Sequence, residues 1–220
     1  MKNDVLAGGV VDRIARQTRE RRGGLDYAEE VRRLLAAALE VMKSCGTTSR
    51  PRVADIVATA GLSNEAFYRH FSSKEALVAA LIEDGTHQLS SYLAHQMGKE
   101  TTPEGRVRRW VEGVMTQTGE DIAATTLAVL WNGGSVGQGM ASGRHPGATA
   151  LGPLLEEPLA ELGSSDPEFD AALAAHAVLG TLSDYLWKRS RPTRAELDRM
   201  TRFIIAAVHP SAVHTAKGQA

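Results

Sequence analysis

The stretch from Val53 to Phe71 constrains the fold most tightly, because it predicts two short helices joined by a turn. Apolar residues of the first helix recur at i, i+3, i+4 and i+7, on one face of a helix with about 3.6 residues per turn: Val53, Ile56, Val57 and Ala60. Gly61 follows directly, and a glycine ends a helix in the left-handed conformation without a Cβ clash.

The second helix of the pair, residues 64 to 71, has an apolar face and a polar face. The hydroxyl of Ser63 is a good N-cap for it. Three residues are predicted to point inward, Ala66, Phe67 and Phe71, and the rest carry hydrogen-bonding groups outward: Asn64, Glu65, Tyr68, Arg69 and His70. A helix of about two turns that buries so little is not stable alone, and its polar groups suit base edges and phosphates. The pattern predicts a DNA-binding helix-turn-helix.

A longer motif includes this pair, G-L-S-N-E-A-F-Y-R-H-F-S-S-K-E-A-L over residues 61 to 77. It resembles the signature of TetR-type transcriptional regulators, most specifically at Tyr68, Phe71, Lys74 and Leu77. With the preceding helices the resemblance covers residues 27 to 82. It implies that the helix-turn-helix reads the major groove, and that the helices after it bind a small molecule and dimerise.

The resemblance also implies roles for single residues. Tyr68 and Lys74 match phosphate contacts, and His70 matches a contact near the far edge of the recognition helix. Specificity is expected at three positions that vary among such regulators. Asn64 suits adenine, Glu65 can accept from cytosine N4, and Arg69 suits guanine. Glu65 has an alternative role, because an acid in the first turn also stabilises the helix dipole.

Two further residues complete the predicted DNA-binding set, Ser63 at the start of the recognition helix and Arg52 before the first helix. Such regulators often have a threonine where Val53 stands, so Arg52 is the expected phosphate ligand. The alternative is an exposed arginine without a DNA partner. Lys74 lies in the first turn of the next helix, for which Ser72 and Glu75 have the spacing of a capping box. A lysine there opposes the helix dipole, which favours a bound anion.

The predicted fold is all-α, with an N-terminal three-helix helix-turn-helix domain and a C-terminal helical domain for ligand binding and dimerisation. The boundaries follow the motifs and the changes in composition: a flexible basic arm at 1–25, the DNA-binding domain at 26–75, a linking helix at 76–99, the effector-binding and dimerisation domain at 100–210, and a flexible tail at 211–220. Two long terminal helices with apolar faces suit a symmetric dimer formed as a four-helix bundle.

Charge is distributed unevenly along the 220 residues. Residues 1–75 hold 13 Lys and Arg against 10 Asp and Glu, a net charge of +3, and the remainder holds 12 against 16, a net charge of −4. This asymmetry favours DNA binding by the N-terminal part. Five arginines lie within residues 1–24, as a basic extension that contacts DNA or as a solvated, partly helical tail.

The C-terminal domain offers a set of large apolar side chains for an apolar effector, Trp110, Met115, Leu127, Leu130 and Trp131. The same residues at helical spacing also suit a plain core. Neither His145 nor His176 has a second metal-ligand residue at i+4 in the sequence, so we expect no metal effector. No sequence motif indicates a cofactor.

The most consistent function is a sequence-specific transcriptional repressor, a homodimer released from operator DNA by a small, apolar molecule. The alternative is a helical ligand-binding or protein-interaction protein with a vestigial helix-turn-helix. No motif of a hydrolase, metalloprotease or nucleotide-binding enzyme occurs, so we expect no enzyme. No apolar run reaches the roughly 18 to 20 residues that span a bilayer, and the start has no signal-peptide pattern, so a cytoplasmic protein is expected.

Overall fold

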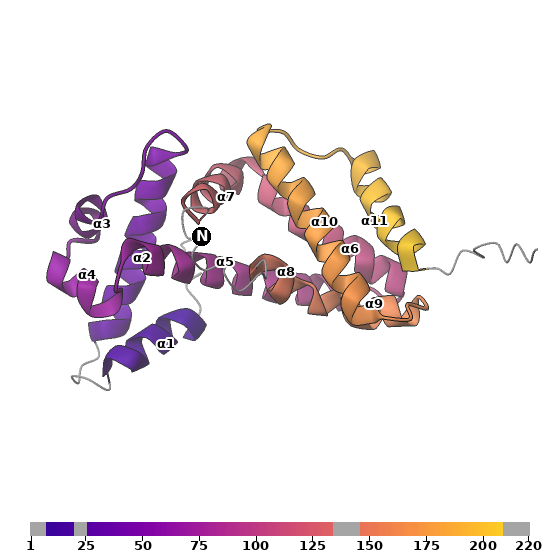
Figure 1. Cartoon of the computed structure of the whole chain (residues 1–220), viewed down its shortest axis with the longest axis horizontal. Helices are drawn as coiled ribbons and strands as arrows, with labels where there is room; N and C mark the ends of the chain where they lie inside the picture. The colour runs from indigo at the N-terminus through magenta and orange to yellow at the C-terminus, as the bar shows by residue number, and fades with distance from the viewer. Residues whose placement is uncertain (1–7, 20–25, 134–145, 209–220) are drawn as a thin grey trace, which may run out of the picture. The chain divides into compact units, whose positions relative to one another are not determined.

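The computed structural model describes residues 8–19, 26–133 and 146–208, and every regular element in these ranges is helical (Figure 1). The predicted all-α class is therefore confirmed. The chain divides into two compact units, and each is built from two separate stretches of sequence: Met1–Gln88 with Gly119–Arg144, and Leu89–Thr118 with His145–Ala220.

The first unit is organised around one long helix, α2 (Asp26–Cys45), whose apolar stripe is buried as its periodicity predicts. Leu34, Leu35 and Met42 are fully buried at its centre. The helices that contact α2 are α1 (Gly8–Arg19), α3 (Val53–Ala60), α4 (Asn64–His70) and α7 (Glu120–Gly133). The start of α5 (Lys74–Met97) closes this core with Leu77, Val78 and Leu81.

Helix α1 corrects the prediction of a flexible arm. Val10, Val11 and Ile14 are buried in the same core as α2, and Arg13 makes an ion pair with Glu83 of α5. These apolar residues lie on one face of a helix, so burying them against α2 stabilises both elements. Residues 1–7 and 20–25 of the predicted arm, and the predicted tail at 211–220, lie outside the described residues.

Helix α7 was expected in the C-terminal domain, but it packs on α2 in the first unit. Ala128 is fully buried in the core of that unit, with Val129 packed against it. A helix that is apolar nearly all round has no unique inward face, so its periodicity does not identify its partner.

The second unit is organised around α6 (Pro103–Met115), where Val107, Trp110 and Val114 are fully buried. The other helices of this unit are α8 (Pro146–Leu151), α9 (Pro153–Glu161), α10 (Pro167–Trp187) and α11 (Arg194–Val208), together with a short 3-10 turn (Thr116–Thr118) and the end of α5. Pro153 begins α9, which follows α8, and Pro158 lies inside α9.

No helix among residues 8–19, 26–133 and 146–208 is long and apolar enough to cross a membrane.

Candidate nucleic-acid interface

The turn between α3 and α4 has the geometry that its sequence predicts. Gly61 adopts φ 62° and ψ 38°, and the N–H of Leu62 donates to the carbonyl of Val57 at 2.9 Å, which closes the end of α3. A guanidinium N–H of Arg33 donates to the carbonyls of Ala60 and Gly61 at 2.5 and 3.2 Å. Arg33 therefore links the turn to α2, in addition to the backbone hydrogen bond that closes α3.

Helix α4 begins at a capped serine and has one buried side. Ser63 Oγ accepts the N–H of Ala66 at 3.1 Å, so the hydroxyl that was predicted to bind DNA also caps the helix. Ala66 and Phe67 are buried, as predicted. On the opposite side Tyr68 is 59% exposed, and Asn64, Glu65 and Arg69 are exposed beside it. The helix is thus fixed to the core on one side and presents polar side chains on the other.

His70 corrects the predicted interface, because its ring does not point outward. The side chain is 0% exposed, and its Nε2 atom lies 2.6 Å from Oε2 of Glu30 on α2. The imidazole and the ring of Tyr27 make a T-shaped contact, with ring centroids 5.5 Å apart. A buried imidazole needs a polar partner, and the acid that supplies it stands 40 positions earlier in the chain. His70 therefore belongs to the contact between α2 and α4.

Arg69 is exposed on the surface of α4 but is held by the same acid. Its Nη1 atom lies 3.2 Å from Oε2 and 3.4 Å from Oε1 of Glu30, and its guanidinium carbon lies 5.7 Å from the centroid of Tyr27. The side chain stays 37% exposed. Arg69 therefore has a charged partner within the protein while it remains accessible to DNA.

Two basic residues flank the helix pair, Arg52 before α3 and Lys74 at the first position of α5. Arg52 is 79% exposed and makes two hydrogen bonds with Asp55, at 3.0 and 3.2 Å, which lower the pKa of the Asp55 carboxyl. Such an exposed ion pair contributes little to stability, so a phosphate can replace Asp55 as the partner of Arg52.

The cap of α5 differs by one residue from the predicted Ser72. It is the Oγ of Ser73 that accepts the N–H of Ala76, at 3.1 Å. The adjacent Glu75 bonds to its own backbone N–H and to Ser73, and these bonds lower the pKa of its carboxyl. Both serines were compatible with a helix start, and only the backbone geometry selects one of them.

The helix-turn-helix and its supporting helix match a known protein family. The model described as "Bacterial regulatory proteins, tetR family" matches residues 34–81. This part of the chain belongs to the tetR family. The tetR-family segment runs from the middle of α2 to the second turn of α5, so it contains both helices of the helix-turn-helix and its supporting helix. DNA binding and transcription regulation are the properties of this family.

Several solved structures share the fold. A putative TetR-family transcriptional regulator from Mesorhizobium loti has a TM-score of 0.60 and 17% identity, and covers 82% of this chain and 95% of its own. E. coli NemR in its reduced form gives 0.61 and 20%, covering 80% and 95%. FadR from Bacillus subtilis in complex with stearoyl-CoA gives 0.53 and 16%, covering 83% and 98%. No curated protein matches the chain.

The residues predicted to line an effector cavity are divided between the two units. Trp110 and Met115 are buried in α6 of the second unit, and Trp110 donates its indole N–H to the carbonyl of Leu151 at 3.0 Å. The other three lie on α7 of the first unit, where Leu127 is buried and Leu130 and Trp131 are partly exposed. Neither unit by itself brings all five together. Among the described residues, no group of three His, Cys, Asp or Glu side chains is placed to hold a metal.

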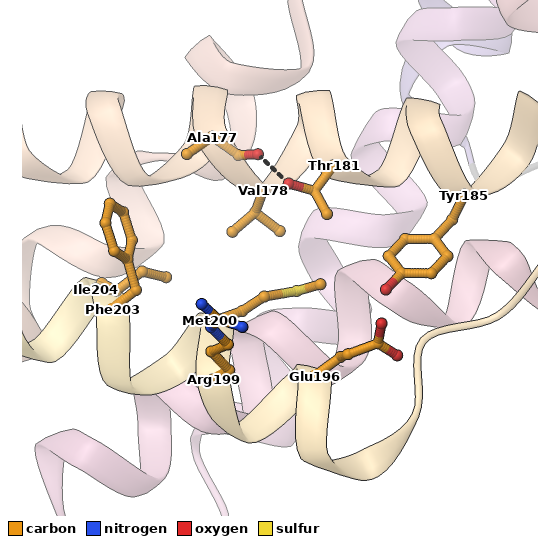
Figure 2. A pocket seen from close by; sticks show the side chains of 9 residues that line it. All are labelled: Ala177, Val178, Thr181, Tyr185, Glu196, Arg199, Met200, Phe203 and Ile204. Atoms are coloured by element: carbon orange, nitrogen blue, oxygen red, sulfur yellow. Dashed lines mark hydrogen bonds between the residues drawn. The ribbon is translucent and has the colours of Figure 1, made fainter.

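A groove of about 290 Å³ lies between α10 and α11, which run side by side (Figures 1 and 2). Figure 2 shows Val178 and Met200 pointing toward each other, with Tyr185 facing Glu196 at one end. The lining is mainly apolar: Ala177, Val178, Thr181, Tyr185, Glu196, Arg199, Met200, Phe203 and Ile204. Both helices were expected from the sequence, but the groove between them was not.

Proposed function

We propose that this tetR-family regulator is a repressor that binds operator DNA through α4 and leaves it when a small molecule binds. One observation carries the DNA-binding part. A helix of seven residues buries Phe67 completely and leaves Asn64, Glu65 and Tyr68 exposed, directly after a turn closed by a left-handed glycine. An α-helix supported in this way presents side chains of the right size to the edges of base pairs in a major groove.

Within this proposal the contacts divide into those that position and those that specify. Tyr68, Arg52 and Lys74 bind phosphates, and Ser63 does so while it caps α4. Asn64 reads adenine, Arg69 reads guanine and Glu65 accepts from cytosine N4. His70 is left out of this set because its ring is buried against Glu30.

We further propose that the operator binder is a homodimer formed through α10 and α11. Support comes from large apolar side chains that these two helices leave exposed: Phe169 at 62%, Leu173 at 58%, Trp187 at 52% and Phe203 at 66%. An exposed apolar surface on two adjacent helices suits the same surface of a second copy, since a two-fold interface must complement itself. A dimer would also present two recognition helices to the two halves of a palindromic operator.

The effector is proposed to be small and apolar. FadR from Bacillus subtilis, which has this fold, was solved with stearoyl-CoA, a ligand with a long apolar chain. Trp110, Met115, Leu127, Leu130 and Trp131 remain the predicted contacts. Binding would favour a conformation of the dimer whose recognition helices no longer match both half-sites, and the population of operator-bound protein would fall.

Selection of binding sites from random duplex DNA tests the central proposal. We expect the full-length protein at moderate salt to enrich an inverted repeat, with half-sites separated by about one helical turn of DNA or a multiple of it. A folded, dimeric protein that enriches no sequence would contradict the proposal. It would favour a ligand-binding or interaction protein in which the helix-turn-helix is vestigial.

A further inference from the structure

Glu30 joins the end of α4 to α2 through two side chains at once. Its Oε2 atom lies 2.6 Å from Nε2 of His70 and 3.2 Å from Nη1 of Arg69. The Glu30 side chain is 16% exposed, His70 is 0% exposed, and Arg69 is 37% exposed. One carboxylate therefore has a fully buried partner on its inner side and a partly exposed cation on its outer side.

The two partners constrain Glu30 differently. The short bond to His70 fixes the carboxylate, because the imidazole is fully buried and packs against the ring of Tyr27. Arg69 has weaker contacts, at 3.2 and 3.4 Å, and its guanidinium lies 5.7 Å from the centre of the Tyr27 ring. His70 thus keeps Glu30 in position whether Arg69 stays or leaves, and Arg69 is the movable member of the cluster.

We propose that Glu30 is a specificity-determining residue, which holds Arg69 on α2 until a matching base pair offers it a better partner. The inference rests on the proposed DNA-binding function of α4. An unrestrained arginine on a recognition helix binds any phosphate and adds affinity that does not depend on sequence. Retention by Glu30 and Tyr27 removes that contact on non-operator DNA. A guanine at the matching position accepts two hydrogen bonds from Arg69 and can thereby replace Glu30 as its partner.

The substitution Glu30→Gln tests this directly, because glutamine keeps an oxygen that accepts the Nε2–H of His70 and removes only the charge that retains Arg69. We expect affinity for a duplex of scrambled sequence to rise about threefold to tenfold, and the salt dependence to steepen by about one phosphate contact. Affinity for the selected operator should change less, so the ratio between the two falls.

Glu29→Gln is the matched control. It removes the same charge from the neighbouring position of α2, but Glu29 pairs with Arg32 on its own helix and not with α4. The second control repeats Glu30→Gln in an Arg69→Ala background, where no further gain in non-operator affinity is expected. Equal effects of the two glutamine substitutions, or a gain that persists without Arg69, would mean that only the overall charge had changed and would overturn the inference.

A second substitution covers the case in which Glu30→Gln fails to fold, as measured by circular dichroism. Tyr27→Leu removes the ring that holds Arg69 from its other side, and should also raise non-operator affinity. The two proposals fail in different ways. A wild-type protein without salt-dependent binding to any duplex contradicts the DNA-binding function, whereas non-operator affinity that neither Glu30→Gln nor Tyr27→Leu raises contradicts only the role of Glu30.

Discussion

Trp110 of α6 donates its indole N–H to the backbone carbonyl of Leu151 in α8, at a distance of 3.0 Å. Both residues are essentially inaccessible to solvent, so the bond satisfies two buried polar groups and fixes one helix against the other.

Replacing this donor should destabilise the second unit. Trp110→Phe leaves the carbonyl of Leu151 without its partner, which costs about 1–3 kcal/mol, and it also leaves a cavity. Urea unfolding followed by circular dichroism measures the loss. Tyr92→Phe, which removes the hydroxyl of a ring that is 43% exposed, is the control and should change the free energy of unfolding by less than about 0.5 kcal/mol. Equal effects of the two substitutions would contradict the structural role of Trp110.

The two serines before α5 should differ in their contributions to stability. Ser73→Ala removes the acceptor for the N–H of Ala76 and should cost about 1 kcal/mol of unfolding free energy. Ser72→Ala should cost much less, since Ser72 is exposed and does not cap the helix. If Ser72→Ala lowers the thermal unfolding temperature more than Ser73→Ala does, Ser72 is the cap.

Lys74 and Arg69 should affect DNA binding in different ways. Lys74→Ala is expected to weaken binding to all duplexes and to reduce the salt slope by about one, because it removes a phosphate contact. Arg69→Ala should relax the preference at one base pair and cost about 1–3 kcal/mol on the operator alone. Fluorescence anisotropy with operator and scrambled duplexes separates the two. If both substitutions lower the two affinities equally, Arg69 does not read a base.

The exposed apolar surface of α10 and α11 should hold the dimer together. Phe203→Glu places a charge where a 66% exposed ring is proposed to meet the second copy, so analytical ultracentrifugation should detect monomers. Ile122→Glu on α7, at a residue with 41% exposure, is the matched control and should remain dimeric. Dimers that survive Phe203→Glu would place the interface elsewhere.

Asp84 on α5 should make stability depend on pH. Burial raises the pKa of its carboxyl, although Gln88 donates a hydrogen bond to it at 2.6 Å. The folded protein therefore holds this proton more tightly than the unfolded chain does. Stability from this group is fully present below the ordinary aspartate pKa of about 3.9 and is lost as pH rises through the raised value.

Urea unfolding of Asp84→Asn at pH 4 and pH 7 isolates this effect. Asparagine keeps an acceptor for Gln88 and does not titrate. We expect the wild type to lose stability relative to the variant between the two pH values. A constant difference between the two proteins would show that Asp84 titrates normally in the fold.

The helix-turn-helix could be predicted from local sequence because every signal for it is local. The apolar spacing that ends at Ala60, the glycine at 61 and the cap at Ser63 all act within a few residues. The family resemblance identified from the same residues agrees with the match over residues 34–81.

What the sequence did not predict depends on partners far apart in the chain. His70 reads as an outward residue by helical spacing, and only the presence of Glu30, 40 positions away, makes burial of its ring favourable. In the same way, the arginines near the start suggest a solvated arm, whereas Val10, Val11 and Ile14 bind α1 to a core whose other members come later. Periodicity gives the face of a helix but not its neighbour.

The packing of α7 on α2 has a consequence for protein engineering. The core of the first unit includes Ala128, which lies after α6 in the sequence. A fragment that stops at Gln88 would expose the surface of α2 that α7 covers. Exchanging N-terminal segments between regulators of this type would therefore join an α2 from one parent to an α7 from another. A functional chimera would need both helices to come from the same parent.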